Sequence, residues 1–452
     1  MTSQSELSGS SIEDIVTALV KEAIKAGADA ADALVAEGIS HAASFRLGKL
    51  EDIERSEGQD LGLRVMVGQR QAAVSSSDLS REGLQPLAER AVAMAKLAPE
   101  DPWCGLAPDD RLAKDFPDLD LIDPVEPGSD HLIELARTAE EAALAIEGVT
   151  NSGGAGASWG RSGIVLATSA GFVGRYGGTS QGVSVSVVAG EGSAMERDYD
   201  FTQARHGEDL ESAAKIGRSA GERAVKRLNP RKMASQSVPV VYDPRVSSGL
   251  VGHLAGAISG SGIARGSSFL KDAMGEQIFK SSVCIVDDPH RRRGFGSKPF
   301  DGEGVANKRH NLIEDGRLTT WLLDTATARQ LGLETTGHAS RGIGGPPSPG
   351  ATNLYMEPGD LSPDELIADI KSGLYITQLI GSGVNGITGD YSRGASGFWI
   401  ENGEIAFAVN EITVAGNLKS MFAEMTPAND LEFKGRVNAP TIRIDGMTIA
   451  GT

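Results

Sequence analysis

The chain has 452 residues, of which 40% are hydrophobic and 23% charged, a composition typical of a soluble globular protein. Its formal charge of −18 argues against nucleic acid and anionic membranes as direct partners, because both repel an acidic protein. Two distant cysteines, Cys104 and Cys284, provide neither a disulfide framework nor a Cys-x-x-Cys motif. The sequence begins without a secretory signal and has no apolar stretch of membrane-spanning length, so we expect a cytoplasmic protein.

Residues 1–100 are predicted to form a unit of helix, β-meander and helix. Apolar residues recur at helical spacing between residues 10 and 27. From about Asp32 to Val74, short alternating segments separated by Gly, Asp and Ser indicate antiparallel strands. A second helix is predicted from about Pro86 to Leu97.

Residues 101–128 are rich in proline and aspartate and predict a linker or surface loop. The order of elements then starts again in residues 129–235. The tetrapeptide Glu-Arg-Ala-Val occurs in the closing helix of both units, at 89–92 and 222–225, which indicates an internal duplication. The second unit comprises a predicted helix at 130–146, strands over 150–200 and a helix at 207–228.

Residues 236–452 are predicted to form a C-terminal domain that mixes short strands, a few helices and glycine-rich loops. The predicted fold class is therefore α+β, with duplicated helix–β-meander–helix units in the N-terminal half and a mixed, β-rich C-terminal domain.

A helix of the C-terminal domain is predicted to begin at Asp243-Pro244, because aspartate caps helices and proline suits their first turn. His253 shares an apolar stripe with Leu250 and Leu254, a pattern that favours a buried histidine with hydrogen-bonded nitrogens. Glycines between residues 249 and 256 leave part of the helix bare, so that another backbone can approach it closely.

The histidines offer no recognisable zinc motif, since the closest two are twenty residues apart (310 minus 290) and a helix-borne zinc pair needs about one turn. The segment Asp287–Arg293 contains three arginines. It is either an anion or carboxylate clamp or, more readily, a loop that pairs its own charges.

The helix after Asp243 resembles the central helix of the TldD/PmbA family. The segment Gly249-Leu-Val-Gly-His-Leu-Ala-Gly-Ala-Ile258 is similar to the PmbA form of that helix, and the resemblance extends over nearly the whole chain. Further segments that resemble the family are Lys298–Val305, Gly316–Leu323, Thr336-Gly-His338 with Ser340-Arg341, Ile387–Gly394, Gly397–Glu404 and Glu411–Leu418.

Active TldD-type members of this family carry His-Glu-x-x-x-His on this helix and a cysteine near the C-terminus as a further zinc ligand. The resemblance places Ser248 at the first histidine and Gly249 at the glutamate, and only His253 is retained. The corresponding tail, residues 432–438, has no cysteine. A lone imidazole cannot hold catalytic zinc, and without the glutamate no residue there activates water. The resemblance thus points to the PmbA (TldE) branch, with no catalytic residue, metal ligand or cofactor expected in this chain.

The resemblance also implies a heterodimer with a TldD-type subunit that carries the zinc, acting as an ATP-independent metallopeptidase on unfolded peptides, including peptide-antibiotic precursors. The family is also labelled as modulators of DNA gyrase, a label that we take as indirect because the chain is acidic. Two alternatives remain open. One is a homodimeric peptide-binding or scaffold protein without a proteolytic role. The other is a metallopeptidase with atypical ligands, such as His253 with His290 or His338.

Several residues of the C-terminal domain are expected to line a cleft or an interface, because they combine donors, acceptors and an aromatic anchor. Strand edges there can also bind an extended peptide through backbone groups. The alternatives are that Trp399 packs in the core and that Asp390 and Arg393 form an internal ion pair. The expected cleft or interface residues are His338, Arg341, Asp390, Tyr391, Arg393 and Trp399.

Overall fold

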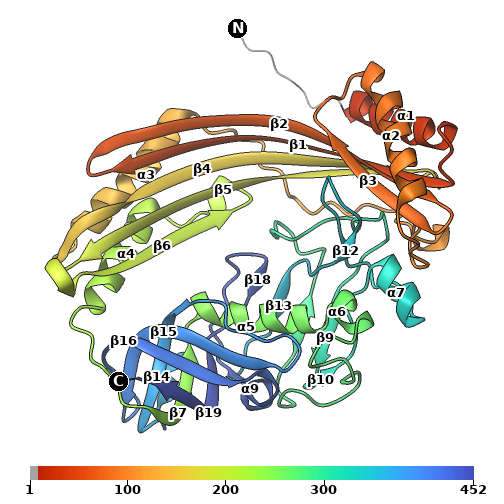
Figure 1. Cartoon of the computed structure of the whole chain (residues 1–452). Helices are drawn as coiled ribbons and strands as arrows, with labels where there is room; N and C mark the ends of the chain where they lie inside the picture. Colours follow the sequence, from red (N-terminus) through yellow and green to blue (C-terminus); the bar gives the residue numbers. More distant parts are fainter. Residues whose placement is uncertain (1–8, 452) are drawn as a thin grey trace.

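A long, curved antiparallel sheet arches over a separate C-terminal domain, and helices cover the outer face of the sheet near both ends (Figure 1). The computed structural model describes residues 9–451. It confirms the predicted α+β class. Between residues 9 and 451, no helix has the length and apolar character needed to cross a membrane.

The N-terminal half repeats the order helix, three strands, helix. The two meanders join in one six-stranded sheet of order β3-β2-β1-β4-β5-β6, because β1 and β4 pair along most of their length. The first unit comprises α1 (Gly9–Lys25), β1 (Ala30–Arg46), β2 (Lys49–Val67), β3 (Arg70–Ser76) and α2 (Arg81–Leu97), and the second comprises α3 (Ser129–Leu144), β4 (Val149–Thr168), β5 (Val173–Ala189), β6 (Glu196–Ala204) and α4 (Ala213–Lys226).

Two helices of these units begin at other residues than predicted. Helix α2 begins at Arg81, because Ser80 is its N-cap and accepts a hydrogen bond from the Gly83 N–H at 3.3 Å, while Pro86 lies inside the helix. Helix α4 begins after Ser212, which caps it in the same way. A capping serine therefore marks a helix start better than the first residue of the apolar pattern.

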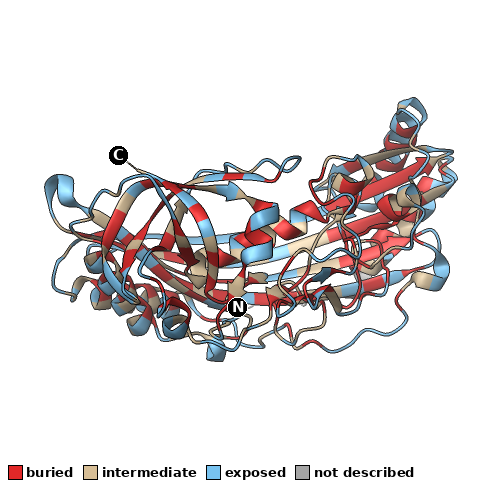
Figure 2. Ribbon diagram, turned by 90° about the horizontal axis from the view of Figure 1, so that it is seen from below, coloured by how far each residue is buried: buried red, intermediate tan, exposed pale blue. Residues whose placement is uncertain are grey.

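Apolar residues of alternate strand positions attach the helices to the outer face of the sheet. Val35 and Val65 pack with α1 and α2, whereas Trp159 and Val185 pack with α3 and α4. Seen from below, buried residues lie mainly along strands and inner helix faces, and exposed residues lie along loops and outer helix faces (Figure 2).

The C-terminal domain contains two mixed sheets, of orders β16-β15-β14-β7-β19-β17 and β10-β9-β8-β13-β18. Helix α5 (Pro244–Ala257) contacts strands of both sheets and shares their apolar core. The remaining helices are α6 (Gly260–Ala264), α7 (Thr325–Leu331), α8 (Pro363–Ile367) and α9 (Leu418–Glu424). The strands are β7 (Gln236–Tyr242), β8 (Ile285–Asp287), β9 (His310–Glu314), β10 (Arg317–Leu318), β11 (Ala339–Ser340), β12 (Ser348–Pro349), β13 (Leu354–Met356), β14 (Ser372–Ile380), β15 (Asp390–Glu401), β16 (Glu404–Asn417), β17 (Thr426–Pro427), β18 (Val437–Asn438) and β19 (Ile442–Ala450).

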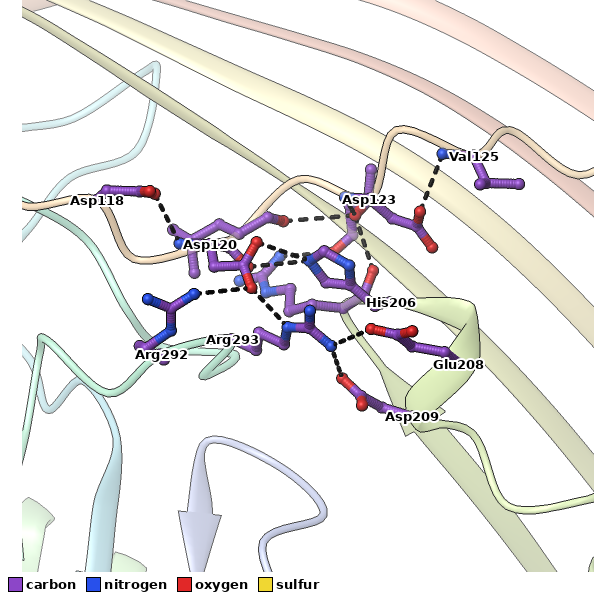
Figure 3. Close-up of polar contacts among 12 residues, drawn as sticks. Asp118, Asp120, Asp123, Val125, His206, Glu208, Asp209, Arg292 and Arg293 are labelled. Carbon is purple, nitrogen blue, oxygen red and sulfur yellow. Dashed lines mark hydrogen bonds and ion pairs between the residues drawn. The ribbon is translucent and has the colours of Figure 1, made fainter.

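Residues 101–128 form an irregular segment that is joined to the C-terminal domain by ion pairs. Arg293 donates to Asp120 at 2.7 Å, and also to Glu208 and Asp209 in the loop after β6 at 2.7 and 2.8 Å (Figure 3). The predicted arginine cluster thus pairs with carboxylates of two other segments. Among the described residues, the arginines therefore do not pair with the acids of their own loop, and Arg293 instead holds three carboxylates of other segments of the chain.

Candidate functional site

Small side chains cover the middle of the inner face of the large sheet. Ser40 lies opposite Gly160 on one side and Ser56 on the other, and Ser158 lies opposite Gly182. A cavity of about 470 Å³ opens on this face. We define the small-residue face as Gly38, Ser40, Ala42, Ser44, Gly156, Ser158, Gly160, Ser180, Gly182 and Ser184.

The C-terminal domain contacts the inner face at both ends and leaves the middle open. Leu34 packs with Phe300 at one end, and the Arg245 guanidinium lies over the Tyr199 ring, 5.4 Å from its centroid, at the other. Since small residues leave space above the strands, this face can accommodate an extended chain of varied sequence.

Helix α5 begins where the sequence predicts, with Asp243 as N-cap and Pro244 in the first turn. Leu250 and Leu254 point into the core of the C-terminal domain. On another side of the helix, a Cβ atom added at any of three glycines would meet no atom within 4 Å, so this side is free. The three glycines are Gly249, Gly252 and Gly256.

The positions that resemble the two zinc histidines have different neighbours. Ser248 lines a cavity of about 380 Å³ between β6, the start of α5 and the tail loop 430–439. His253 instead lies against the edge of the Tyr391 ring, with 6.1 Å between centroids.

His253 is half-buried, whereas the sequence predicted a buried ring. The buried stripe of α5 runs through Ser247, Leu250 and Leu254, which places His253 at its margin. Burial and then the charge of Arg393 lower the pKa of His253, so the ring is neutral near pH 7.

The donor set at α5 does not fit a catalytic zinc ion. Ser248 and Gly249 supply neither imidazole nor carboxylate, and the adjacent tail loop supplies no thiolate. Within the described part of the chain, no group of three or more His, Cys, Asp or Glu side chains is arranged to hold a metal ion. Zinc sites need three or four such donors around one point.

Four of the six expected cleft or interface residues have buried side chains, namely His338, Arg341, Tyr391 and Trp399. The ring nitrogens of His338 lie 3.2 Å from Asp287 and 2.8 Å from Thr336, inside the C-terminal domain. The Arg341 side chain is 1% exposed and pairs with Asp32 of β1. His338 therefore cannot line an open cleft, whereas Arg341 joins the sheet to the C-terminal domain and lines a cavity of about 280 Å³ between them.

The remaining expected residues all belong to β15 but differ in environment. Trp399 is buried in the core, which was the alternative interpretation. Asp390 accepts from Thr388 at 2.7 Å and from Asn417 at 3.1 Å, so the internal partners of Asp390 are not Arg393. Tyr391 and Arg393 both lie near His253, as the ring contact and the effect of Arg393 on its pKa show.

A buried charge cluster that sequence reasoning missed joins the two parts of the chain. Arg64 Nε donates to Asp32 Oδ2 at 2.8 Å, and Arg341 pairs with the other oxygen of the same carboxylate. Burial alone would raise the pKa of Asp32, but Arg341 and Arg64 together hold it below its ordinary value. The only signal was the family resemblance of the segments 298–305 and 340–341, which contain Arg341 and the neighbouring acids.

The pKa of Glu303, next to this cluster, predicts a pH dependence of stability. Burial, followed by the charge of Asp301, raises the pKa of Glu303 to about 7 from an ordinary value of 4.5. The folded chain thus binds this proton more tightly than the unfolded chain, and its stability falls as pH rises from 4.5 to 7. We expect Glu303→Gln to be more stable than the unsubstituted protein at pH 8 by about 2 kcal/mol and nearly equal to it at pH 5.

Urea unfolding of both proteins at the two pH values measures this difference. Exposed Glu191 is the matched control, because its replacement by glutamine removes the same charge from the surface. If Glu303→Gln and Glu191→Gln change the free energy of unfolding equally at both pH values, the pKa of Glu303 is not raised in the folded chain.

The comparisons with known proteins agree with this architecture. Models of three domains of the PmbA/TldA metallopeptidase family match the chain: domain 1 at residues 31–95, the central domain at 122–228 and the C-terminal domain at 235–451. The chain therefore belongs to this metallopeptidase family.

Individual relatives match over almost their full length. The chain is 39% identical to Metalloprotease PmbA of Escherichia coli O157:H7, covering 97% of this chain and 96% of that protein, and 38% identical to the PmbA homolog of Haemophilus influenzae with the same coverage. A crystal structure from Bacteroides thetaiotaomicron, described as a candidate modulator of DNA gyrase, superposes with a TM-score of 0.90 at 28% identity over 97% of this chain and 99% of that one. TldE from Thermococcus kodakarensis shares the fold, with a TM-score of 0.84 at 22% identity over 97% of this chain and 100% of that one.

Proposed function

We propose that this chain is a PmbA/TldE-like, non-catalytic subunit of a zinc metallopeptidase, and that a TldD-type subunit supplies the metal. The observation that carries the proposal is the environment of α5. Ser248 and the tail loop face the same cavity, yet they offer neither the imidazole nor the thiolate of the family's zinc site, and His253 lies against the Tyr391 ring. The family's peptidase chemistry then requires a second subunit.

In this proposal the chain contributes a wall of the peptide chamber. The small-residue face and the free glycine side of α5 both present backbone with little side-chain bulk. Such surfaces leave room for an extended peptide and discriminate little between side chains. Unfolded peptides are therefore the proposed substrates.

Reconstitution tests this proposal. The purified chain alone, a TldD-type chain alone, and the two mixed are assayed for cleavage of a fluorescent unstructured peptide. We expect cleavage from the mixture and none from this chain. Cleavage by this chain alone, at a rate that the TldD-type chain does not change, would refute the proposal.

The alternative of a metallopeptidase with atypical ligands makes a different prediction for His253. In the described structure His290 lies 2.8 Å from Asn307 and His338 is buried beside Asp287, so neither histidine joins His253. We expect His253→Ala to leave zinc content and peptide cleavage of the assembled complex within about twofold of the unsubstituted complex. Removing the glutamate of the partner's zinc motif is the positive control. A joint loss of zinc and activity in His253→Ala would establish the alternative.

A further inference from the structure

A cavity of about 280 Å³ lies between the inner face of the large sheet and loops of the C-terminal domain. Its walls include Tyr176 and Ser162 from the sheet and residues 295–298 and 300–302 from the C-terminal domain. On β4, Ser162 is the next residue after Gly160 that points to the inner face. A peptide lying along the small-residue face would therefore lead into this cavity.

The cavity has an excess of positive charge in a strongly acidic protein. Four cationic side chains line it, with one carboxylate, that of Asp301. The chain as a whole carries a formal charge of −18, so this local excess runs against the overall composition. The four cationic residues are Arg205, Lys298, Arg341 and Arg436.

Three of these cations lack a carboxylate partner. Arg205 donates to the backbone carbonyls of Thr179 and Phe295 at 2.9 and 2.8 Å, and Lys298 donates to the Ala339 carbonyl at 2.9 Å. Arg436 is exposed. Within residues 12–451, no carboxylate oxygen lies within 4 Å of the side-chain nitrogens of Arg205, Lys298 or Arg436. The fourth cation, Arg341, is already paired with Asp32.

Asp301 does not neutralise the cavity. Its Oδ1 accepts from the N–H groups of Glu303 and Val305 at 2.8 and 2.9 Å, and its Oδ2 accepts from the Ala339 N–H at 3.0 Å. These bonds direct both oxygens toward backbone rather than toward Lys298. Unpaired buried charge is costly, and an anionic ligand offsets that cost.

The protonation states of Arg205 and Tyr176 favour the binding of an anion. Burial and then the charge of Arg436 lower the pKa of Arg205 to about 10, so it stays charged at neutral pH while gaining from an added negative charge. Burial raises the pKa of Tyr176 to about 12, which keeps its hydroxyl protonated and able to donate.

We propose that this cavity binds the C-terminal carboxylate of an extended peptide through Arg205, Lys298 and Arg436. Guanidinium groups bind carboxylates in a planar, two-pronged fashion, and the lysine adds a point charge. The peptide as the source of the carboxylate rests on the proposed function, whereas the anion site itself rests on the cavity alone. The site would fix the direction in which a peptide lies along the small-residue face.

Calorimetric titration of the full-length chain tests this site. The ligands are N-acetyl-trialanine with a free carboxylate, the same peptide as its C-terminal amide, and inorganic phosphate. The variant is Arg436→Gln, since Arg436 is exposed and its loss spares the fold. Arg265→Gln is the matched control, because Arg265 is exposed at the end of α6 and lies outside the cavity.

We expect the free peptide to bind at least about tenfold more tightly than the amide, the difference that one charged hydrogen bond makes. Arg436→Gln should remove this preference, Arg265→Gln should retain it, and phosphate should compete with the free peptide. Equal binding of acid and amide, or equal losses in both variants, would overturn the site. Phosphate binding that depends on Arg436, without any peptide binding, would overturn the peptide assignment. These outcomes do not depend on which subunit holds zinc, so the proposed function can fail independently.

Discussion

Replacing Asp32 by asparagine is expected to lower the free energy of unfolding by about 3–5 kcal/mol, the cost of leaving buried charges without their partner. The Asp32 carboxylate is 2% exposed and is shared by Arg64 and Arg341, whose side chains are 4% and 1% exposed. Its neutralisation leaves two buried guanidinium groups side by side. Because Arg341 belongs to the C-terminal domain and Asp32 to β1, the sheet and the domain should also separate more readily.

Two further variants make this prediction specific. Arg341→Met keeps the Asp32–Arg64 pair and should cost less than Asp32→Asn, whereas Asp110→Asn, on the exposed turn Asp109–Arg111, should cost nothing. Thermal and urea unfolding, monitored by circular dichroism, rank the stabilities of the three variants. If the Asp32→Asn variant is as stable as the Asp110→Asn variant, the charge cluster of Asp32, Arg64 and Arg341 does not stabilise the fold.

A tryptophan at Ser158 is expected to weaken binding of an unstructured peptide by at least about tenfold without lowering stability. Ser158 is exposed in the middle of the small-residue face, between Ala42 and Gly182, and lines the cavity of about 470 Å³ there. An indole would fill part of that space and cover the neighbouring strand backbone. Fluorescence anisotropy of a labelled unstructured peptide with the isolated chain measures the affinity.

The control for Ser158→Trp is a tryptophan on the other face of the same strand. Arg161 of β4 is exposed and, being an odd number of residues away, points to the outer face. Arg161→Trp should bind the peptide as the unsubstituted chain does. Equal affinities for all three proteins would show that peptides do not bind along the small-residue face.

Helices with one apolar stripe were predictable from the sequence, but the great length of the central strands was not. The predicted helix at 130–146 corresponds to α3 (Ser129–Leu144), because its apolar residues repeat at helical spacing. Strands β1 and β4 run for 17 and 20 residues, although the sequence suggested short segments. Over much of each strand, the inner-face residues are small or polar because no other described part of the chain packs on them. The alternation of apolar and polar residues that marks a strand is therefore absent there.

The candidate site was only partly predictable, because its groups come from distant segments. The absence of imidazole at Ser248 and of carboxylate at Gly249 could be read directly from the chain. The half-exposed position of His253 could not, since the apolar stripe of α5 can be drawn on either side of Leu250 and Leu254. Contacts such as that between Asp32 and Arg341 leave no local pattern, and only the fold reveals them.

Zinc content measured separately for each chain tests the central claim most directly. The isolated chain and its complex with a TldD-type subunit are incubated with zinc, dialysed and analysed by mass spectrometry of the metal. We expect no stoichiometric zinc on this chain and about one zinc per complex, retained after Ser248→Ala and His253→Ala. One tightly held zinc ion per isolated chain, lost in either variant, would contradict it.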